Sequence, residues 1–233
     1  NAYASRLLFE GNRCVGVEYI QNGEKKTARA TKEVIVSGGA LESPKLLMLS
    51  GIGPADHLRE HGIDVRVDLP GVGQNFHNHV LTGVIRACKQ DVPQGNLNLS
   101  EAALFCQSDP GWVGPDLQIA FVHVPFDIII GQQRPNSVSI LPGVVRPMSR
   151  GWIKLASSDP TAKPLVNPNY LGADSDRERL IQAVKLSRDI FATDAFSDWV
   201  TCVASWRQER GDPMPAGGRP TVRSRRLGRA LRQ

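Results

Sequence analysis

Two consecutive glycines, Gly38 and Gly39, follow a run of β-branched residues and precede an apolar helical pattern. The run Glu33–Ser37 predicts a short buried strand of the parallel type. Glycines at the carboxyl end of such a strand let the backbone approach a ligand where a Cβ atom would clash. Backbone N–H groups at this position suit the phosphate or adenosine groups of a nucleotide. A strand followed by two glycines also occurs in α/β proteins that bind nothing there, so the residues alone leave both interpretations open.

The elements that would position these glycines are two short helices. Ser43 stands where an N-cap belongs and Pro44 where the first helical residue belongs, so we expect a helix to begin here. A second helix is predicted over residues 54–61, with Gly62 as its C-terminal cap. His57 and His61 share one face of that helix without a third ligand. We interpret them as surface residues rather than metal ligands, and we predict no metal site.

The segment from residue 39 to 53 resembles the second sequence signature of the glucose-methanol-choline (GMC) oxidoreductases, FAD-dependent enzymes that oxidise alcohols. Three further segments resemble the same family in the same order. Residues 1–19 are similar to its hairpin, and residues 69–79 are similar to its PGVGxNxxDH turn, with Asn78 in place of aspartate. Residues 149–171 resemble the start of its C-terminal region. The resemblance runs from Asn1 to about Val200.

This resemblance implies an α/β plus α+β fold, in which part of an FAD/NAD(P)-binding Rossmann-like domain joins a mostly antiparallel-sheet substrate domain. The implied reaction is hydride transfer from a small-molecule alcohol, of the choline or simple alcohol type, to FAD. By position in the family's hairpin, Ala4 touches the cofactor. Ser37, Gly38 and Gly39 would provide backbone contacts to the same FAD.

The family's catalytic histidine lies beyond the position equivalent to Val200, and no histidine of this sequence lies beyond His123. A histidine suits this work because its pKa lies near neutrality. The amino-terminal G-x-G-x-x-G turn that holds the FAD pyrophosphate is also absent. The catalytic residues therefore stay unknown, and we expect the chain alone to be inactive with little or no bound flavin. The alternative is a non-catalytic remnant that is truncated or frameshifted.

Changes in pattern divide the chain into four parts: part of the FAD-binding domain (1–79), the substrate domain (80–166, with the GMC C-terminal region from about 149), a helical segment (167–206) and an arginine-rich tail expected to be disordered (207–233). Alternating apolar residues predict an antiparallel sheet in the second part. Its strands are expected at residues 80–87, 102–106, 116–124, 137–145 and 152–156. Phe121, His123 and Phe126 could line a pocket near the far end of this sheet, although a core role is favoured.

In the third part, Ser175 and Glu178 have the spacing of a capping box. They open the clearest predicted helix, Asp174–Ala192. Its apolar side chains are expected to form one packing face.

The net charge of +5 is concentrated in the tail. Residues 207–233 contain eight arginines, no lysine and two acids, so the rest of the chain is nearly neutral. A basic arm for an acidic partner and a reading-frame accident are the two explanations. We favour the accident, because lysine is absent and the resemblance stops near Val200. Nucleic-acid binding is disfavoured because no aromatic residues accompany the arginines.

The cysteines lie far apart, at positions 14, 88, 106 and 202, which is typical of reduced thiols and favours a cytoplasmic location. No apolar run approaches the roughly 20 residues of a membrane helix. The chain starts with asparagine and shows no leader sequence. The oligomeric state is left unassigned.

Overall fold

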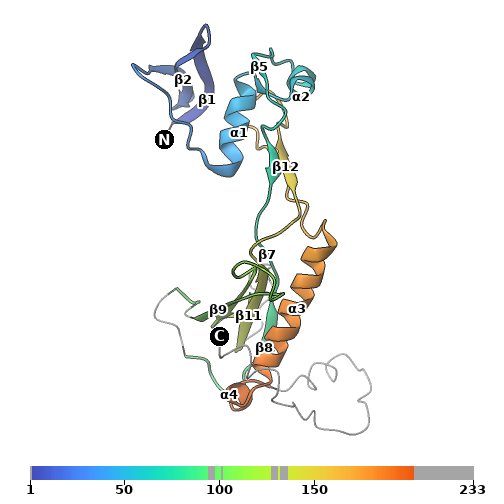
Figure 1. Cartoon of the computed structure of the whole chain (residues 1–233). Helices are drawn as coiled ribbons and strands as arrows, with labels where there is room; N and C mark the ends of the chain where they lie inside the picture. Colours follow the sequence, from blue (N-terminus) through green and yellow to red (C-terminus); the bar gives the residue numbers. More distant parts are fainter. Residues whose placement is uncertain (1, 94–97, 101, 127–130, 132–135, 202–233) are drawn as a thin grey trace.

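The computed structural model describes residues 2–93, 98–100, 102–126, 131 and 136–201. These residues combine helices with mostly antiparallel sheets, as the resemblance implied. Two lobes are visible, and the chain passes between them after β6 (Gln74–Phe76), after β11 (Ser137–Val144) and after β13 (Leu165–Asn167) (Figure 1). We call the lobe of residues 2–76 and 151–167 the upper lobe, and the lobe of residues 80–144 and 174–201 the lower lobe.

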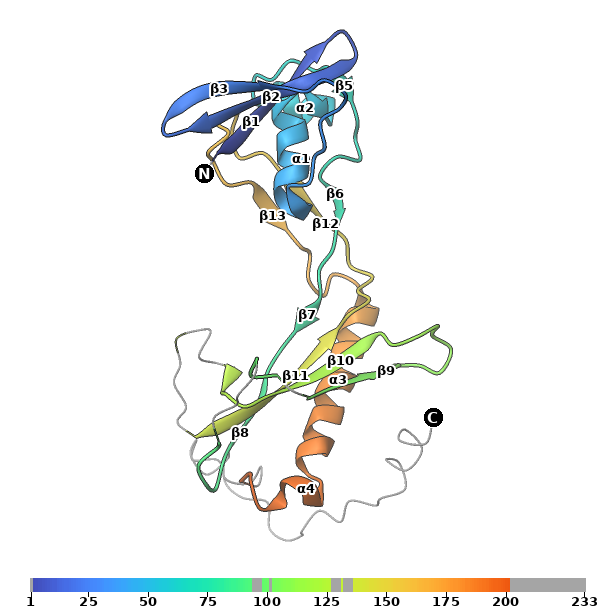
Figure 2. The same ribbon diagram turned by 90° about the vertical axis from the view of Figure 1, so that its left-hand side faces the viewer.

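The upper lobe opens with a three-stranded antiparallel sheet, β1 (Tyr3–Glu10), β2 (Arg13–Gln21) and β3 (Glu24–Arg29), in that order (Figure 2). The β1–β2 pair confirms the predicted hairpin. β3 was not predicted, because it is exposed along most of its length and lacks apolar alternation.

Helix α1 (Gly39–Leu49) starts earlier than expected and follows an unpaired segment. Glu33–Ser37 has no regular secondary structure and pairs with no described strand, and Ile35 is 79% exposed, so the predicted buried strand is wrong for this structure. A β-branched run forms a strand only where a neighbour supplies hydrogen bonds. The N-cap of α1 is Gly38 rather than Ser43, and Pro44 lies in the second turn.

Helix α1 packs on α2 (Ala55–Glu60) through a small apolar core. The buried members are Met48, Leu49, Leu58 and Leu155. β4 (Ile52–Gly53) and β5 (Val67–Asp68) form a short parallel pair beside these helices. Gly62 follows α2 with a φ of +67°, which confirms the predicted glycine cap.

A second sheet of the upper lobe joins segments that are distant in sequence. β12 (Gly151–Lys154) pairs with β13 (Leu165–Asn167) on one side and with β6 (Gln74–Phe76) on the other. The expectation that residues 152–156 join the sheet of residues 80–145 is therefore wrong. Alternation identifies a strand but does not identify its neighbours.

The lower lobe contains the predicted antiparallel sheet. Its strands are β7 (Val80–Leu81), β8 (Val84–Ala87), β9 (Ala102–Cys106), β10 (Leu117–Val122) and β11 (Ser137–Val144), in the order β7-β11-β10-β9, with β8 also on β11. Helix α3 (Asp174–Phe191) lies against this sheet, and the short α4 (Asp194–Ser197) follows it (Figure 2). The core between them is Val84, Ile119, Val138, Ile140, Phe191 and Val200.

The start of α3 differs from the capping box expected at Ser175. Ala173 is the N-cap, and no side chain caps the helix. Asp176 is fully buried, and its carboxylate accepts hydrogen bonds from the N–H groups of Met148 and Ser149 at 2.8 Å each. Arg179, 4% exposed, donates to Asp176 Oδ1 at 2.8 Å. The buried face of α3 therefore begins with an ion pair.

His57 is not the surface residue that the sequence suggested. Its side chain is 11% exposed, and the N–H of Leu155 donates to its Nε2 at 3.0 Å. This bond links α2 to the segment after β12. Burial lowers the pKa of His57, the charges of His61 and Lys154 act in the same direction, and Glu60 opposes them.

We expect the stability of the protein to fall in mild acid through His57. The unfolded chain binds a proton near pH ~6.5, but the folded chain does so only at lower pH. The contribution of neutral His57 to the free energy of unfolding is therefore complete above pH ~6.5. It is lost as the pH falls toward the lowered pKa of the folded state. Denaturant titrations should show a larger loss of stability below pH ~6.5 in the wild type than in His57→Gln. His61→Gln is the control, and equal pH slopes in wild type and His57→Gln would refute the assignment.

Candidate cofactor site

A cavity of about 480 Å³ lies between strand β1 and the first turns of α1. Its lining includes Ala4 on the strand and Ser37 and Gly38 at the entrance to the helix. The structure thus brings together three of the four residues that the sequence suggested. Gly39 does not line the cavity and instead begins α1 with a φ of +78°. That φ lies in the left-handed region that favours glycine.

The backbone at Gly38 has little room for a side chain. A Cβ atom there would lie 3.3 Å from Glu42 Cβ and 3.3 Å from Ser43 N. Glycine avoids this crowding and leaves the backbone open beside the cavity. Helix α1 also directs the unpaired N–H groups of its first turn toward this end, where negative charge is favourable. These features fit a nucleotide cofactor.

The cavity walls are mostly apolar, with a few polar side chains on both the strand and the helix. Such a lining is typical of small-molecule sites, where apolar area binds and a few polar groups orient the ligand. The apolar wall residues are Leu7, Val17, Val34, Ile35, Val36, Leu46 and Leu49, and the polar side chains are Tyr3, Glu42, Ser43 and Lys45, in addition to Ser37. No histidine lines this cavity, so it offers no evident base of that kind among the described residues.

Sequence reasoning missed a polar cluster in this wall, formed by Tyr3, Glu42 and Lys45. The Lys45 Nζ atom donates to Tyr3 Oη at 2.5 Å and lies 3.4 Å from Glu42 Oε2. Tyr3 Oη in turn donates to Glu42 Oε2 at 3.2 Å. The spacing of Glu42 and Lys45, three residues apart on a helix, could have indicated the ion pair. Nothing in the sequence pattern indicated Tyr3.

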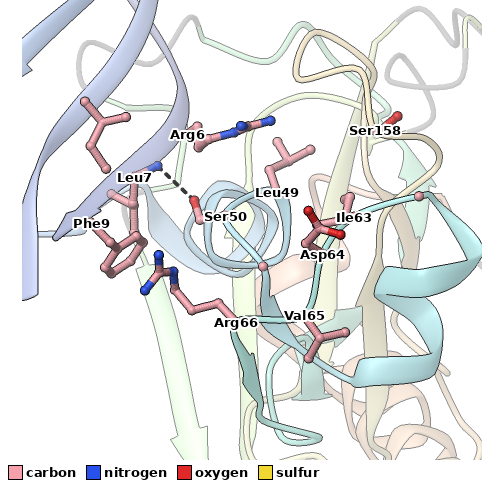
Figure 3. A pocket seen from close by; sticks show the side chains of 13 residues that line it. Arg6, Leu7, Phe9, Leu49, Ser50, Ile63, Asp64, Val65, Arg66 and Ser158 are labelled. Carbon is pink, nitrogen blue, oxygen red and sulfur yellow. Dashed lines mark hydrogen bonds between the residues drawn. The ribbon is translucent and has the colours of Figure 1, made fainter. Parts of the chain in front are cut away.

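A larger cavity, about 770 Å³, lies further along β1, beside the C-terminal end of α1, and includes none of the predicted site residues (Figure 3). Ser50 at the end of α1 is already engaged, because its Oγ accepts from the N–H of Leu7 at 2.9 Å and donates to the carbonyl of Leu46 at 2.6 Å. Arg66 packs over the ring of Phe9, 4.4 Å from its centroid. These contacts fix the hairpin on the helix, and they assemble no recognisable catalytic group.

In the lower lobe, Phe121 and His123 line a cavity of about 360 Å³ together with Cys88 and Phe196. The rings of Phe121 and His123 meet edge to face, with their centroids 5.2 Å apart. Phe126 does not line this cavity, and its N–H donates to Ser139 Oγ at 2.7 Å. Phe121 and His123 therefore share a cavity, from which Phe126 is separated, and Phe121 also packs against the core.

The described residues contain no group of three or more histidine, cysteine, aspartate or glutamate side chains that could hold a metal ion. Within the same part of the chain, no helix has both the length and the apolar character needed to cross a bilayer. Cys14, Cys88 and Cys106 are free thiols.

Two family models, both described as GMC oxidoreductase, match the chain. The N-terminal model matches residues 1–81 and the C-terminal model matches residues 147–229. The second match passes Val200, so the expectation that the resemblance ends there is wrong. The end of the resemblance was one of two observations that favoured a reading-frame accident in the tail. The absence of lysine from residues 207–233 is now the only one that supports it.

Relatives with assigned names are similar over most of this chain. Mitochondrial choline dehydrogenase of Mus musculus is 40% identical over 219 residues, covering 83% of this chain and 36% of its own length. Choline oxidase of Arthrobacter globiformis is 37% identical over 205 residues, covering 84% of this chain and 38% of its own. The chain thus spans less than half the length of these relatives.

Solved structures of oxidases are also similar to this chain over most of its length. Pyridoxine 4-oxidase from Mesorbium loti superimposes with a TM-score of 0.80 at 30% identity, covering 85% of this chain and 40% of its own. A variant of formate oxidase from Aspergillus oryzae RIB40 superimposes with a TM-score of 0.76 at 26% identity, covering 86% of this chain and 44% of its own.

Proposed function

Because the chain belongs to the GMC oxidoreductase family, we propose that the cavity between β1 and α1 holds part of an FAD cofactor. The observation that carries this proposal is the meeting of Ala4, Ser37 and Gly38 in one cavity. Gly39 contributes by turning the chain into α1.

Each wall of the cavity has a separate part in binding. The glycine at 38 lets the backbone approach the cofactor, and the first turn of α1 offers N–H groups to its anionic portion. The apolar side chains of β1 and α1 exclude water from the remaining surface. The chemistry that FAD would supply there is a hydride acceptor for oxidation of an alcohol. We assign no catalytic base, since the cavity contains no histidine.

The substrate that we propose is a small alcohol of the choline type. Relatives named choline dehydrogenase and choline oxidase support this proposal, whereas pyridoxine 4-oxidase and formate oxidase show that the fold serves other substrates. The domain division near residue 80 stays a proposal, with the lower-lobe sheet as the substrate side. Free thiols support a reducing compartment such as the cytoplasm, although the mouse relative is named mitochondrial.

We expect the purified chain to bind added FAD saturably but weakly, with a dissociation constant of about 0.1 mM. One hairpin, the segment of residues 34–38 and one helix supply all the contacts of this cavity, so flavin should not remain bound through purification. Fluorescence anisotropy of FAD titrated with the chain measures the affinity.

Ala4→Trp should weaken this binding at least ~10-fold, because an indole ring at this exposed strand position fills the cavity. Ala28→Trp is the matched control, since Ala28 is exposed on β3 of the same sheet and does not line the cavity. An FAD titration without saturation, or equal affinity of both variants, would overturn the proposal.

A further inference from the structure

Lys45 is a charged side chain buried inside a cavity wall. Its side chain is 3% exposed, although it belongs to the surface helix α1. Lysine is rarely buried so completely unless its charge is paired. Moving an ammonium group out of water costs several kcal/mol, at about the level that a well-placed partner can offset. The partners of Lys45 therefore indicate what this burial achieves.

The partners of Lys45 lie on both sides of the cavity. Glu42 belongs to the same helix, one turn earlier, whereas Tyr3 belongs to strand β1. The ammonium group donates to the Tyr3 hydroxyl at 2.5 Å and also lies 5.2 Å from the centre of its ring. The hydroxyl then donates to Glu42 at 3.2 Å. Each of the three groups contacts the other two, so the link between strand and helix is closed.

This link stands beside the proposed cofactor contacts. Tyr3 directly precedes Ala4 on the strand, and Lys45 lies on the helix that starts after Gly38. The cavity lining includes Tyr3, Ala4, Gly38, Glu42 and Lys45. The distance between Ala4 and Gly38 therefore depends on how β1 is held against α1, and the Lys45 link is a polar bridge between these two elements within the cavity itself.

We infer that Lys45 is a positioning residue, which through Tyr3 and Glu42 sets the separation of the two cavity walls and so the affinity for FAD. This inference rests on the proposed function. Lys45 need not touch the cofactor, and its charge is already compensated by Glu42. Its role is to keep the walls at the spacing at which strand and helix can contact one ligand together.

The test is the affinity of the full chain for added FAD in three variants, measured by flavin anisotropy alongside denaturant stability. Lys45→Met keeps the unbranched apolar stem of the side chain and removes the donor, and should weaken FAD binding ~10-fold. Tyr3→Phe keeps the ring and removes the hydroxyl, and should weaken it ~5-fold. The double variant should be little worse than Lys45→Met, because both changes break the same link.

Ser5→Ala separates positioning from stability. Ser5 is buried on the same strand, and its hydroxyl donates to Glu18 Oε1 at 2.8 Å, but it does not line the cavity. This variant should lose stability and keep the FAD affinity of the wild type.

The outcomes distinguish the two proposals. If the wild type binds FAD and Lys45→Met binds it equally well, the positioning role is wrong and the cofactor site stands. If Lys45→Met and Ser5→Ala lose affinity in proportion to their loss of stability, Lys45 is only structural. If the wild type does not bind FAD, the proposed function and the role of Lys45 both fail.

Discussion

Replacing Asp176 with asparagine will lower the free energy of unfolding by about 3–5 kcal/mol. The carboxylate is fully buried and satisfies several donors at once. Oδ1 accepts from Met148 N and from Arg179, and Oδ2 accepts from the N–H and the hydroxyl of Ser149. Burial alone would raise the pKa of Asp176, but these hydrogen bonds and the charge of Arg179 lower it below its usual range. The carboxylate is thus ionised in the folded chain.

An asparagine at 176 would fail in either orientation of its amide. Its NH₂ group would face two donors, and Arg179, 4% exposed, would lose part of its countercharge. Asp116, fully buried, lies 3.5 Å from Arg179 and would remain as its acidic partner. A buried donor without an acceptor costs more free energy than a hydrogen bond contributes to stability. The expected loss is large for this reason.

Asp174→Asn is the control for this prediction. Asp174 begins the same helix and pairs with Arg177, but its side chain is 79% exposed. The expected change is within about 0.5 kcal/mol, because solvent screens exposed ion pairs. Urea unfolding followed by circular dichroism measures both variants. Equal losses for the two would mean that burial of Asp176 does not matter.

The second large effect is expected for Gly73→Ala, which should cost about 3 kcal/mol or more. Gly73 has a φ of +78°, and a Cβ atom there would lie 2.2 Å from the carbonyl oxygen of Ile153. The Ile153 N–H donates to the Gly73 carbonyl at 2.6 Å. Strain at a left-handed φ adds to a contact with backbone that cannot rotate away.

Gly71→Ala lies in the same turn and is the matched control. A Cβ atom at Gly71 meets nothing within 4 Å, and its φ is not in the left-handed region. We expect this variant to be neutral or more stable by up to about 1 kcal/mol, since alanine has fewer unfolded conformations than glycine. Thermal melts of the two variants provide the comparison, and a tolerated Gly73→Ala would show that β6 can move away from β12.

The sequence predicted the elements whose signal is local. The strand at residues 102–106 has the predicted bounds, and Gly62 caps α2, because alternation and a left-handed glycine act over a few residues. Elements that depend on distant partners were missed or misplaced. Glu33–Ser37 has the composition of a strand and no described neighbour, and β12 pairs with β6 instead of the lower-lobe sheet.

The same distinction applies to the candidate site. Ala4, Ser37 and Gly38 were predicted from the strand–glycine pattern and the family motifs, and the structure places them in one cavity, while their contact with a cofactor stays a prediction. Lys45 was not found, because a lysine in a helix is normally exposed and its burial depends on Tyr3, a distant residue in sequence. Asp176 was interpreted only as part of a helix start for the same reason. The N–H groups of Met148 and Ser149, which donate to its carboxylate, lie 28 and 27 residues away in sequence.

The pairing of β6 with β12 determines how the chain can be assembled. The upper lobe closes only when Trp152 reaches Gln74, after the whole sheet of the lower lobe has been synthesised. That sheet in turn receives α3 only after β13 has completed the upper lobe. The two lobes are therefore interleaved along the polypeptide, so a nascent chain on the ribosome cannot finish one before starting the other. No single proteolytic cut releases either lobe with all of its described strands and helices.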